Sequence, residues 1–205
     1  QTLLDAAGYG SHAPATTFYT GVLTPVTYHY PRFKFEACRV FTNKPACGPK
    51  RGHGTPQPRF GQEVQLDKIA VKLGIDPAEL RLRNLTRPES LTASWLKIGS
   101  NGLRECIEKV VEMSAWKERR GKLGRGRGLG LACSTYMCGA GVAIYWNKMP
   151  HSGVQILLDR SGSVIVYCGA TEIGQGSDDV LAGLVAEALG VEIGNVRVVT
   201  GDTGI

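Results

Sequence analysis

The spacing of hydrophobic residues divides the chain into a loop-rich start, a helical middle and a mixed end. Between residues 58 and 74 the apolar side chains recur at helical spacing and form a broad stripe, which predicts an amphipathic helix. Gly74 suits the position just after a helix end, because glycine adopts a left-handed backbone without steric cost. The stripe consists of Phe60, Val64, Leu66, Ile69, Ala70 and Leu73.

Two further helices are expected in the middle of the chain. Asp76 can cap a helix that has Pro77 at its first position, and Glu79 stands where a reciprocal cap belongs. A third helix starts near Gly102. One of its faces holds Leu103, Ile107, Val110, Val111 and Ser114.

The flanking regions predict strands and loops. Residues 33–42 indicate a strand with an irregular end, and residues 46–58 indicate a loop rich in glycine and proline. Residues 154–159 and 163–168 predict two strands joined by a tight turn, followed by a loop, a helix over 178–189 capped by Ser177, and a strand over 196–202. The expected buried side of that helix holds Val180, Leu181, Leu184, Val185, Ala188 and Leu189.

Composition and charge narrow the function classes. Hydrophobic residues make up 42% of the 205 residues and charged residues 20%, which is typical of a globular protein. The net charge is +6, and residues 117–127 alone contribute +5 through six Lys or Arg and one Glu. We expect this basic segment to be a flexible, exposed connection between two lobes, residues 1–120 and 121–205. Nucleic-acid binding through its Arg-Gly pattern is an open alternative.

Cysteine and histidine usage favours neither a disulfide scaffold nor a metal centre. The six cysteines contain no C-x-x-C pair, and the four histidines lie far apart. We therefore expect reduced thiols, a cytoplasmic location and no metal ligand from the protein. No apolar run approaches the ~18 residues that a bilayer requires, so no membrane association is expected.

Two glycine-rich loops are the candidate functional elements. They cover residues 48–54 and 171–177, and in each of them the glycines allow backbone N–H groups to approach a ligand closely. Arg51 offers a fork of donors suited to phosphate, and Gln175 offers a donor and an acceptor. Each loop is equally compatible with a tight turn that carries solvated polar residues. Asp178 and Asp179 weigh against an anion at the following helix start.

At these loops the chain resembles the molybdenum hydroxylases, the xanthine dehydrogenase and aldehyde oxidase family. The run from Pro49 to Gln57 (PKRGHGTPQ), followed by IDPAELRLRN at 75–84, is similar to the family's A-F-R-G-F-G-x-P-Q loop and the segment after it. GATEIGQG at 169–176 is similar to the family's G-x-x-E-x-G-Q-G loop. YHYP at 28–31 and TGDT at 200–203 match two further family segments, and the order of all four agrees.

The resemblance implies a fold, a cofactor and residue roles. It implies an α+β fold of two partial molybdenum-cofactor lobes, with molybdopterin held by loops from both. By the same resemblance Gln175 donates a hydrogen bond near the metal's oxo ligand, Gly174 and Gly176 allow the pterin to approach, and the Arg51–Gly52 backbone lies near the metal. The pterin rather than the protein ligates the metal, and electrons pass to iron–sulfur clusters and FAD on partner subunits.

Two departures from the family pattern bear on the substrate. Pro49-Lys50 replaces the usual Ala-Phe, and His53 replaces an aromatic residue that helps to hold a flat substrate. Together with Gly8–His12, this loop is most similar to the large subunit of the 4-hydroxybenzoyl-CoA reductases. His53 is then expected to face the substrate as a proton donor, the alternative being a hydrogen-bonded loop histidine.

Two family loops have no counterpart in the chain. It contains neither F-G-G-K nor the G-x-G-E loop with the catalytic glutamate, so we expect an internal, inactive fragment with no cofactor bound by itself. The parent is expected to hydroxylate or reductively dehydroxylate an aromatic or heteroaromatic substrate, an acyl-CoA being one candidate. A non-catalytic scaffold or binding module is the alternative from another class.

Overall fold

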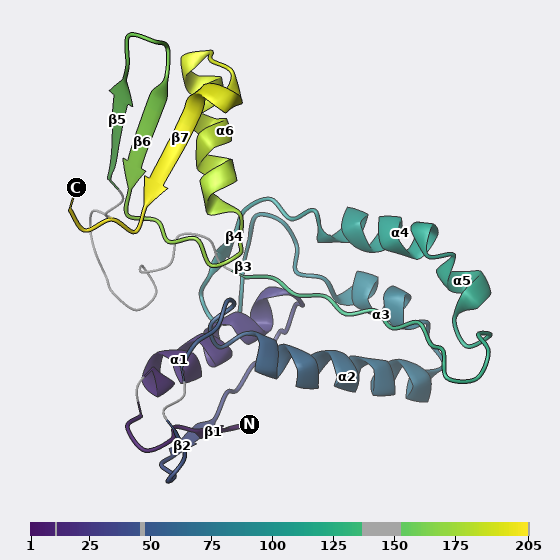
Figure 1. The fold of residues 1–205 in the computed structure, drawn as a ribbon. Helices are drawn as coiled ribbons and strands as arrows, with labels where there is room; N and C mark the ends of the chain where they lie inside the picture. Colours follow the sequence, from purple (N-terminus) through teal and green to yellow (C-terminus); the bar gives the residue numbers. More distant parts are fainter. Residues whose placement is uncertain (11, 46–47, 137–152, 205) are drawn as a thin grey trace. The chain divides into compact units, whose positions relative to one another are not determined.

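The computed structural model describes residues 1–10, 12–45, 48–136 and 153–204 (Figure 1). The chain divides into two compact units, residues 1–138 and 139–205. Residues 129 and 131 pack against the core of the first unit. The assignment of 1–120 and 121–205 to two cofactor lobes stays a prediction.

The first unit begins with a strand–helix–strand arrangement. Strand β1 (Thr2–Asp5) pairs in parallel with β2 (Ala37–Val40), and helix α1 (Ala13–Leu23) lies between them in the sequence. A short 3-10 helix, Thr24–Val26, follows α1. The predicted strand at 33–42 is confirmed over its central part, whereas β1 gave no periodic signal because it is only four residues long.

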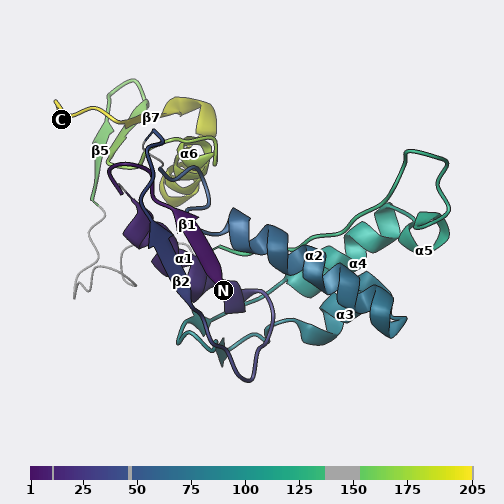
Figure 2. The same ribbon diagram turned by 90° about the horizontal axis from the view of Figure 1, so that it is seen from below.

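Helices dominate the rest of the first unit. Helix α3 (Pro77–Asn84) lies between α2 (Pro56–Leu73) and α4 (Leu103–Met113), and both views show the three together (Figures 1 and 2). A small hairpin of β3 (Ser90–Leu91) and β4 (Lys97–Ile98) precedes α4, and the one-turn helix α5 (Trp116–Arg119) follows it.

The sequence signals at Gly74 and Asp76 are confirmed, whereas the Glu79 carboxylate pairs with Arg83 at 2.7 Å rather than with the Asp76 N–H. Gly74 closes α2 with a left-handed backbone at φ 66°. The Asp76 side chain accepts the backbone N–H groups of Ala78 at 2.8 Å and Glu79 at 3.3 Å, as an N-cap should. The start of α2 corrects the predicted loop at 46–58, because the helix already begins at Pro56, where a fixed φ suits the first turn.

The buried face of α2 differs from the apolar stripe that the sequence displays. Phe60 is 75% exposed and Leu73 is 60% exposed, whereas Arg59 and Glu63 are buried and Ala70 is fully enclosed. Buried charge is stable only with partners, and both charged residues have them, as described below. Periodicity alone therefore identified the helix correctly, but only part of the predicted stripe packs: Ala70 is enclosed and Leu66 lies against the core.

The apolar core of the first unit lies where α2, α3 and α4 meet. Its buried members are Tyr28, Ala78, Ile107, Trp116 and Cys133. These residues come from parts of the chain more than 100 residues apart, so the segment around Cys133 is an integral part of this unit. Partly buried residues complete the core: Tyr30, Leu66, Leu82, Leu85, Leu103, Val111, Leu129 and Leu131.

The second unit has the predicted strand–strand–helix–strand order. Strand β5 (Val154–Leu158) is antiparallel to β6 (Val164–Cys168), and β6 is parallel to β7 (Val196–Thr200). Helix α6 (Ser177–Leu189) connects β6 to β7 and packs on β7, and a 3-10 turn, Ile193–Asn195, precedes β7 (Figure 1).

The buried side of α6 is narrower than predicted. Val180 and Leu184 are each 60% exposed, and Ala188 and Leu189 are exposed as well, whereas Ala186 is buried. The sheet below α6 buries Val164 and Val166 of the central strand β6. A sheet of three strands is too small to cover every apolar residue of a 13-residue helix, so part of the predicted stripe faces outward.

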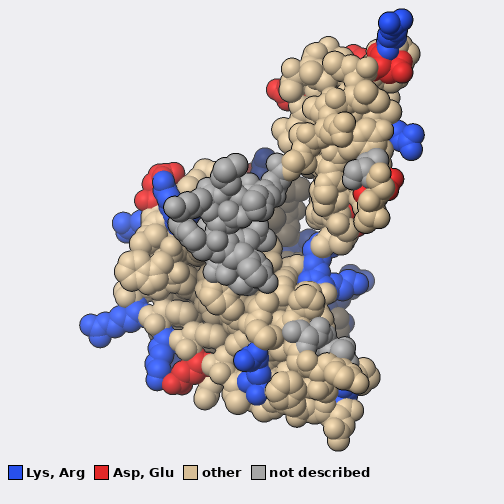
Figure 3. All heavy atoms as spheres, turned by 90° about the vertical axis from the view of Figure 1, so that its left-hand side faces the viewer, with Lys and Arg blue, Asp and Glu red and all other residues tan. Residues whose placement is uncertain are grey.

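Charge is dispersed on the face drawn in Figure 3. Lys and Arg side chains there stand apart among uncharged residues and form no continuous stripe. Within the described part of the chain, no helix is long and apolar enough to cross a membrane. The four described cysteines, Cys38, Cys106, Cys133 and Cys168, are free thiols.

Candidate functional site

The first glycine loop docks on helix α1. Gly54 has φ +73°, and a Cβ added there would lie 2.6 Å from the Thr16 carbonyl oxygen, so only glycine fits. The Thr20 hydroxyl donates to the Gly54 carbonyl at 2.8 Å. Gly52 also has a positive φ, +87°, and its carbonyl accepts the Thr55 N–H at 2.9 Å. The loop backbone is therefore held in one defined shape against α1.

His53 sits half-buried in this loop and contacts α1. Its Nε2 lies 2.7 Å from the Thr16 Oγ1, and its ring centroid is 5.2 Å from that of Tyr19 and 6.1 Å from that of His12. The Thr16 hydroxyl donates its own hydrogen to the His12 carbonyl at 3.0 Å. We therefore assign the His53 tautomer with hydrogen on Nε2, which leaves Nδ1 as an acceptor.

The surroundings of His53 favour the neutral imidazole. Burial lowers the pKa of His53, and the nearby His12 lowers it further. The ring is thus uncharged at neutral pH. Its expected contact with substrate and its role as proton donor stay predictions, and donation from this tautomer requires the Nε2 bond to Thr16 to exchange. Arg51 lies in the same loop and is exposed.

The second glycine loop, residues 171–177, leads into α6 in the other unit; the family motif covers 169–176. Gly174 and Gly176 have φ values of +90° and +78°, and nothing lies within 4 Å of a Cβ placed on Gly176. A flat ligand could therefore approach this backbone. The predicted cap by Ser177 is not formed: Gly176 is the N-cap, and Ser177 is the first helical residue.

The Glu172 side chain instead binds the backbone around the start of α6. Its Oε1 accepts the N–H groups of Gly174 at 2.5 Å and Gly176 at 3.2 Å. Its Oε2 accepts the Ser177 hydroxyl at 3.2 Å and the Asp178 N–H at 3.4 Å. These bonds, that of Gly176 most, lower the pKa of Glu172 to about 2 against the opposing effect of desolvation.

Gln175 folds back onto its own loop. Its Oε1 accepts the Ile173 N–H at 2.6 Å, and its Nε2 donates to the Thr171 carbonyl at 2.8 Å and to the Ser177 hydroxyl at 3.1 Å. Both Nε2 hydrogens are thus engaged within the loop. Donation to a bound ligand requires one of these bonds to exchange. The catalytic role of Gln175 stays a prediction.

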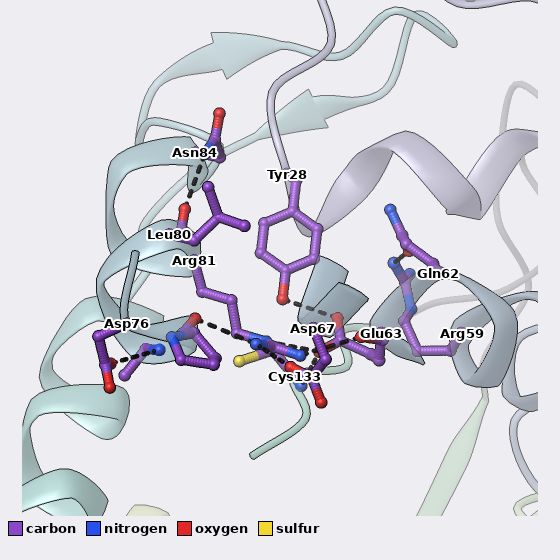
Figure 4. A network of polar contacts seen from close by, with 12 residues as sticks. Tyr28, Arg59, Gln62, Glu63, Asp67, Asp76, Leu80, Arg81, Asn84 and Cys133 are labelled. Carbon is purple, nitrogen blue, oxygen red and sulfur yellow. Dashed lines mark hydrogen bonds and ion pairs between the residues drawn. The ribbon is translucent and has the colours of Figure 1, made fainter. Parts of the chain in front are cut away.

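A buried polar network in the first unit was not expected from the sequence (Figure 4). The Glu63 carboxylate accepts hydrogen bonds from the Tyr28 hydroxyl at 2.7 Å, from Arg81 Nε at 2.8 Å and from the Cys133 N–H at 3.1 Å. Arg81 also pairs with Asp67 at 2.8 Å. The network joins α2 and α3 to the segment around Tyr28 and to the segment around Cys133.

The network perturbs the pKa values of its members. Burial, together with the hydrogen bond to Glu63, raises the pKa of Tyr28. Burial alone would lower the pKa of Arg81, but the hydrogen bonds to Glu63 and Asp67 outweigh it and raise that pKa. Burial raises the pKa of the Cys133 thiol. Tyr28, Arg81 and Cys133 therefore keep their usual protonation states at neutral pH.

Arg59 extends the polar interior toward α1. Its guanidinium donates to the carbonyl oxygens of Leu23 at 2.9 Å and Thr24 at 3.2 Å, where α1 ends. A cavity of about 550 Å³ lies beside Arg59 and Glu63, with Phe60, Val64 and Cys133 among its lining residues. None of the predicted site residues lines it.

The basic segment at 117–127 is exposed over most of its length. Two of its side chains turn back on the first unit: Arg119 donates to the Ser114 carbonyl at 3.1 Å, and Arg120 lies over the Trp116 ring at 5.3 Å from its centroid. Its predicted mobility and its alternative role in nucleic-acid binding both stay predictions.

The predicted site residues form two groups, one in each unit. Arg51, Gly52 and His53 share the loop on α1, and Gly174, Gln175 and Gly176 share the loop before α6. Among the described residues, no three His, Cys, Asp or Glu side chains gather as a set of metal ligands. The donors present, backbone N–H groups and amide side chains in glycine loops, fit an organic cofactor better than a bare ion.

The sequence patterns did not predict the hydrogen bonds that Glu63, Arg81, Glu172 and Thr16 make. Glu172 stood inside a quoted motif, and a carboxylate just before a helix start is a usable signal for capping. Glu63 follows Arg59 by one helical turn on the side of α2 that carries Ala70, which is a weaker signal. Thr16 carried no signal, because its contact with His53 spans 37 positions.

Family comparisons identify the class of protein. Residues 1–85 match one family model described as a molybdopterin cofactor-binding domain, and residues 107–205 match a second model with the same description. These two matches include both glycine loops.

Individual relatives define the family. The chain is 37% identical to the xanthine dehydrogenase molybdenum-binding subunit of Escherichia coli O157:H7, across 99% of this chain and 27% of that protein. It is 34% identical to the aldehyde oxidoreductase molybdenum-binding subunit PaoC of Escherichia coli K12, across 69% of this chain and 19% of that protein. The chain belongs to the molybdopterin-binding domains of the xanthine dehydrogenase/aldehyde oxidoreductase family.

Solved structures agree with this assignment. The aldehyde oxidoreductase of Desulfovibrio desulfuricans superposes with a TM-score of 0.77 at 27% identity, across 98% of this chain and 22% of that one. Quinoline 2-oxidoreductase of Pseudomonas putida 86 has the same fold, with a TM-score of 0.77 at 23% identity across 97% of this chain and 27% of that one. The chain thus spans about a quarter of the length of the proteins it matches.

Proposed function

We propose that this chain is part of the molybdopterin-binding subunit of a molybdenum hydroxylase-type oxidoreductase. The observation that carries the proposal is the pair of shaped glycine loops, each lying within a match to a molybdopterin-binding domain. The whole subunit works with iron–sulfur and flavin partners, in agreement with relatives that are named as subunits. The chain by itself is inactive, because it supplies only part of the cofactor cradle.

Each loop contributes a different kind of contact to the proposed cofactor site. When bound, the molybdenum–pterin group supplies the two-electron redox chemistry for adding or removing a hydroxyl on an aromatic ring. The Arg51–Gly52 backbone and the backbone around Gly174 and Gly176 hold and orient it. Gln175 would donate toward it from Nε2 by giving up its bond to Ser177, which is longer than its bond to Thr171.

His53 supplies the polar contact to the substrate in this proposal. Its Nε2 is committed to Thr16, so the neutral ring presents Nδ1 as an acceptor for a substrate hydroxyl. A hydroxylated aromatic ring, such as that of 4-hydroxybenzoyl-CoA, fits such an acceptor better than an unsubstituted ring does. The similarity of the 48–54 loop to the 4-hydroxybenzoyl-CoA reductases supports this substrate class.

Metal analysis of the assembled enzyme tests the proposal. We expect molybdenum close to one per chain together with a pterin, and we expect neither in the 205-residue chain purified alone. Turnover should then be screened with 4-hydroxybenzoyl-CoA, xanthine and an aromatic aldehyde in the presence of an artificial electron carrier. An assembled complex with no molybdenum would favour the scaffold alternative, and turnover by the chain alone would refute its inactivity.

A further inference from the structure

Glu172 connects several residues of the second glycine loop by hydrogen bonds, although it has no role in the proposed chemistry. Each of its carboxylate oxygens accepts two hydrogen bonds, three of the four donors being backbone N–H groups. Within the described part of the chain, no Lys or Arg forms an ion pair with Glu172. The loop backbone itself therefore stabilises the charge.

The geometry explains why a carboxylate belongs at this position. The first N–H groups of a helix lack partners within the helix and favour negative charge. Gly176, the N-cap of α6, has no side chain to accept them. Glu172 reaches across the turn that Gly174 and Gly176 make with positive φ values, and it binds the N–H groups on both sides of Gln175.

Ser177 links Glu172 to Gln175. The Ser177 hydroxyl donates its only hydrogen to Glu172 Oε2, so it can offer only lone pairs to Gln175. The Gln175 amide turns its nitrogen toward Ser177, in the same orientation that the Ile173 N–H and the Thr171 carbonyl require. Without Glu172, the Ser177 hydroxyl can rotate and no longer has to accept from Nε2, so Gln175 is held by its bonds to Ile173 and Thr171 and loses the third.

We propose that Glu172 is a positioning residue, whose carboxylate shapes the loop and sets the orientation of the Ser177 hydroxyl so that it accepts from Gln175 Nε2. This inference rests on the proposed function for its importance to turnover. The orientation itself is a property of the chain without cofactor. It can therefore be tested even if the proposed function fails.

The experiment uses NMR spectra of the ¹⁵N-labelled 205-residue chain and of its Glu172→Gln variant. We expect the Gly174 and Gly176 N–H resonances to shift, because the charge-assisted hydrogen bond of each N–H to Glu172 is weakened. The Gln175 side-chain NH₂ protons should exchange with water about tenfold faster, because the Ser177 hydroxyl no longer has to accept from them. Glu187→Gln is the matched control, since Glu187 is exposed on α6 and should leave these signals unchanged.

A second readout separates positioning from mere folding. The melting temperature of Glu172→Gln should equal that of the control, while Ser177→Ala should reproduce the change at Gln175 and leave the Gly174 N–H resonance in place. Unchanged Gln175 NH₂ signals in Glu172→Gln would overturn the proposal. In a molybdenum-loaded enzyme, Glu172→Gln should lower kcat with little change in KM or in metal content.

Discussion

Glu63 in the first unit and Glu172 in the second each accept several hydrogen bonds, but in opposite surroundings. The Glu63 side chain is 6% exposed and faces the fully enclosed Arg81, and its partners come from three distant segments. Glu172 is exposed, faces no cation among the described residues and bonds only within its own loop. One carboxylate therefore joins segments, and the other shapes one turn.

We expect the Glu63 carboxylate to affect the stability of the first unit and the Glu172 carboxylate to affect the shape of one loop. A buried carboxylate that loses its cation leaves an uncompensated charge, so breaking the Glu63–Arg81 pair should strongly destabilise the first unit. An exposed carboxylate competes with water, so Glu172 contributes little to folding and acts on the conformation of a few residues. We expect variants in the two networks to fail in different ways.

Glu63→Ala should give the largest loss of stability, about 3–5 kcal/mol, because Arg81 stays buried with only Asp67 to balance it. Urea unfolding followed by circular dichroism measures this. Glu79→Ala is the control, since Glu79 pairs with Arg83 at the surface and should cost about 0.5 kcal/mol or less. Equal losses in the two variants would contradict the comparison.

The double variant Glu63→Met, Arg81→Met tests whether Glu63 and Arg81 act as a pair. Two apolar side chains of similar length remove the buried charge along with its partner, so the loss should be smaller than the sum of the two single substitutions. The same unfolding experiment tests this expectation. Additive losses would mean that the two residues do not act as a pair.

Gln175→Ala in the assembled enzyme should lower kcat by about 10²–10³, or about 2.7–4 kcal/mol of barrier, if Gln175 is the proposed donor. Stability should change by about 0.5 kcal/mol or less, because the residue is exposed. Gln155→Ala, on the exposed strand β5, is the matched control. Normal kcat at full molybdenum content would remove Gln175 from the site, and loss of molybdenum would make it a cofactor-retention residue.

Gly54→Ala should destabilise the first glycine loop by about 1–3 kcal/mol, because the new Cβ would meet the Thr16 carbonyl at 2.6 Å in a backbone with positive φ. Gly48→Ala, with nothing within 4 Å of its Cβ, is the control. Thermal unfolding of the two variants gives the comparison. No difference between them would show that the loop is free to move away from α1.

The smallest effect is a pH-dependent loosening of the second loop. The Glu172 pKa falls from 4.5 to about 2 on folding, so its hydrogen bonds are fully present above pH 4.5 and are lost as the pH falls through about 2. The carboxyl carbon resonances of the neighbouring Asp178 and Asp179 must be assigned separately from that of Glu172. A carboxyl carbon resonance of Glu172 with a midpoint near 4.5 would contradict the network.

The sequence by itself determined the local elements and the family. Gly74 and Asp76 marked a helix end and a helix start correctly, because both act through their own backbone and the next three residues. The two strands of the β5–β6 hairpin followed from short apolar runs around a turn. The four matching motifs pointed to the molybdopterin-binding family, which the comparisons confirm.

Only the tertiary structure decided which faces are buried and where the polar groups find partners. The parallel pairing of β1 with β2 joins residues 35 positions apart, and Glu63 collects donors from residues 28, 81 and 133. Hydrophobic periodicity shows which positions are apolar, but it does not show which polar side chains find partners and are buried. A charged residue such as Arg59 can be buried once distant carbonyl groups accept from its two terminal nitrogens, even though its Nε finds no partner, and those groups meet only in the folded chain.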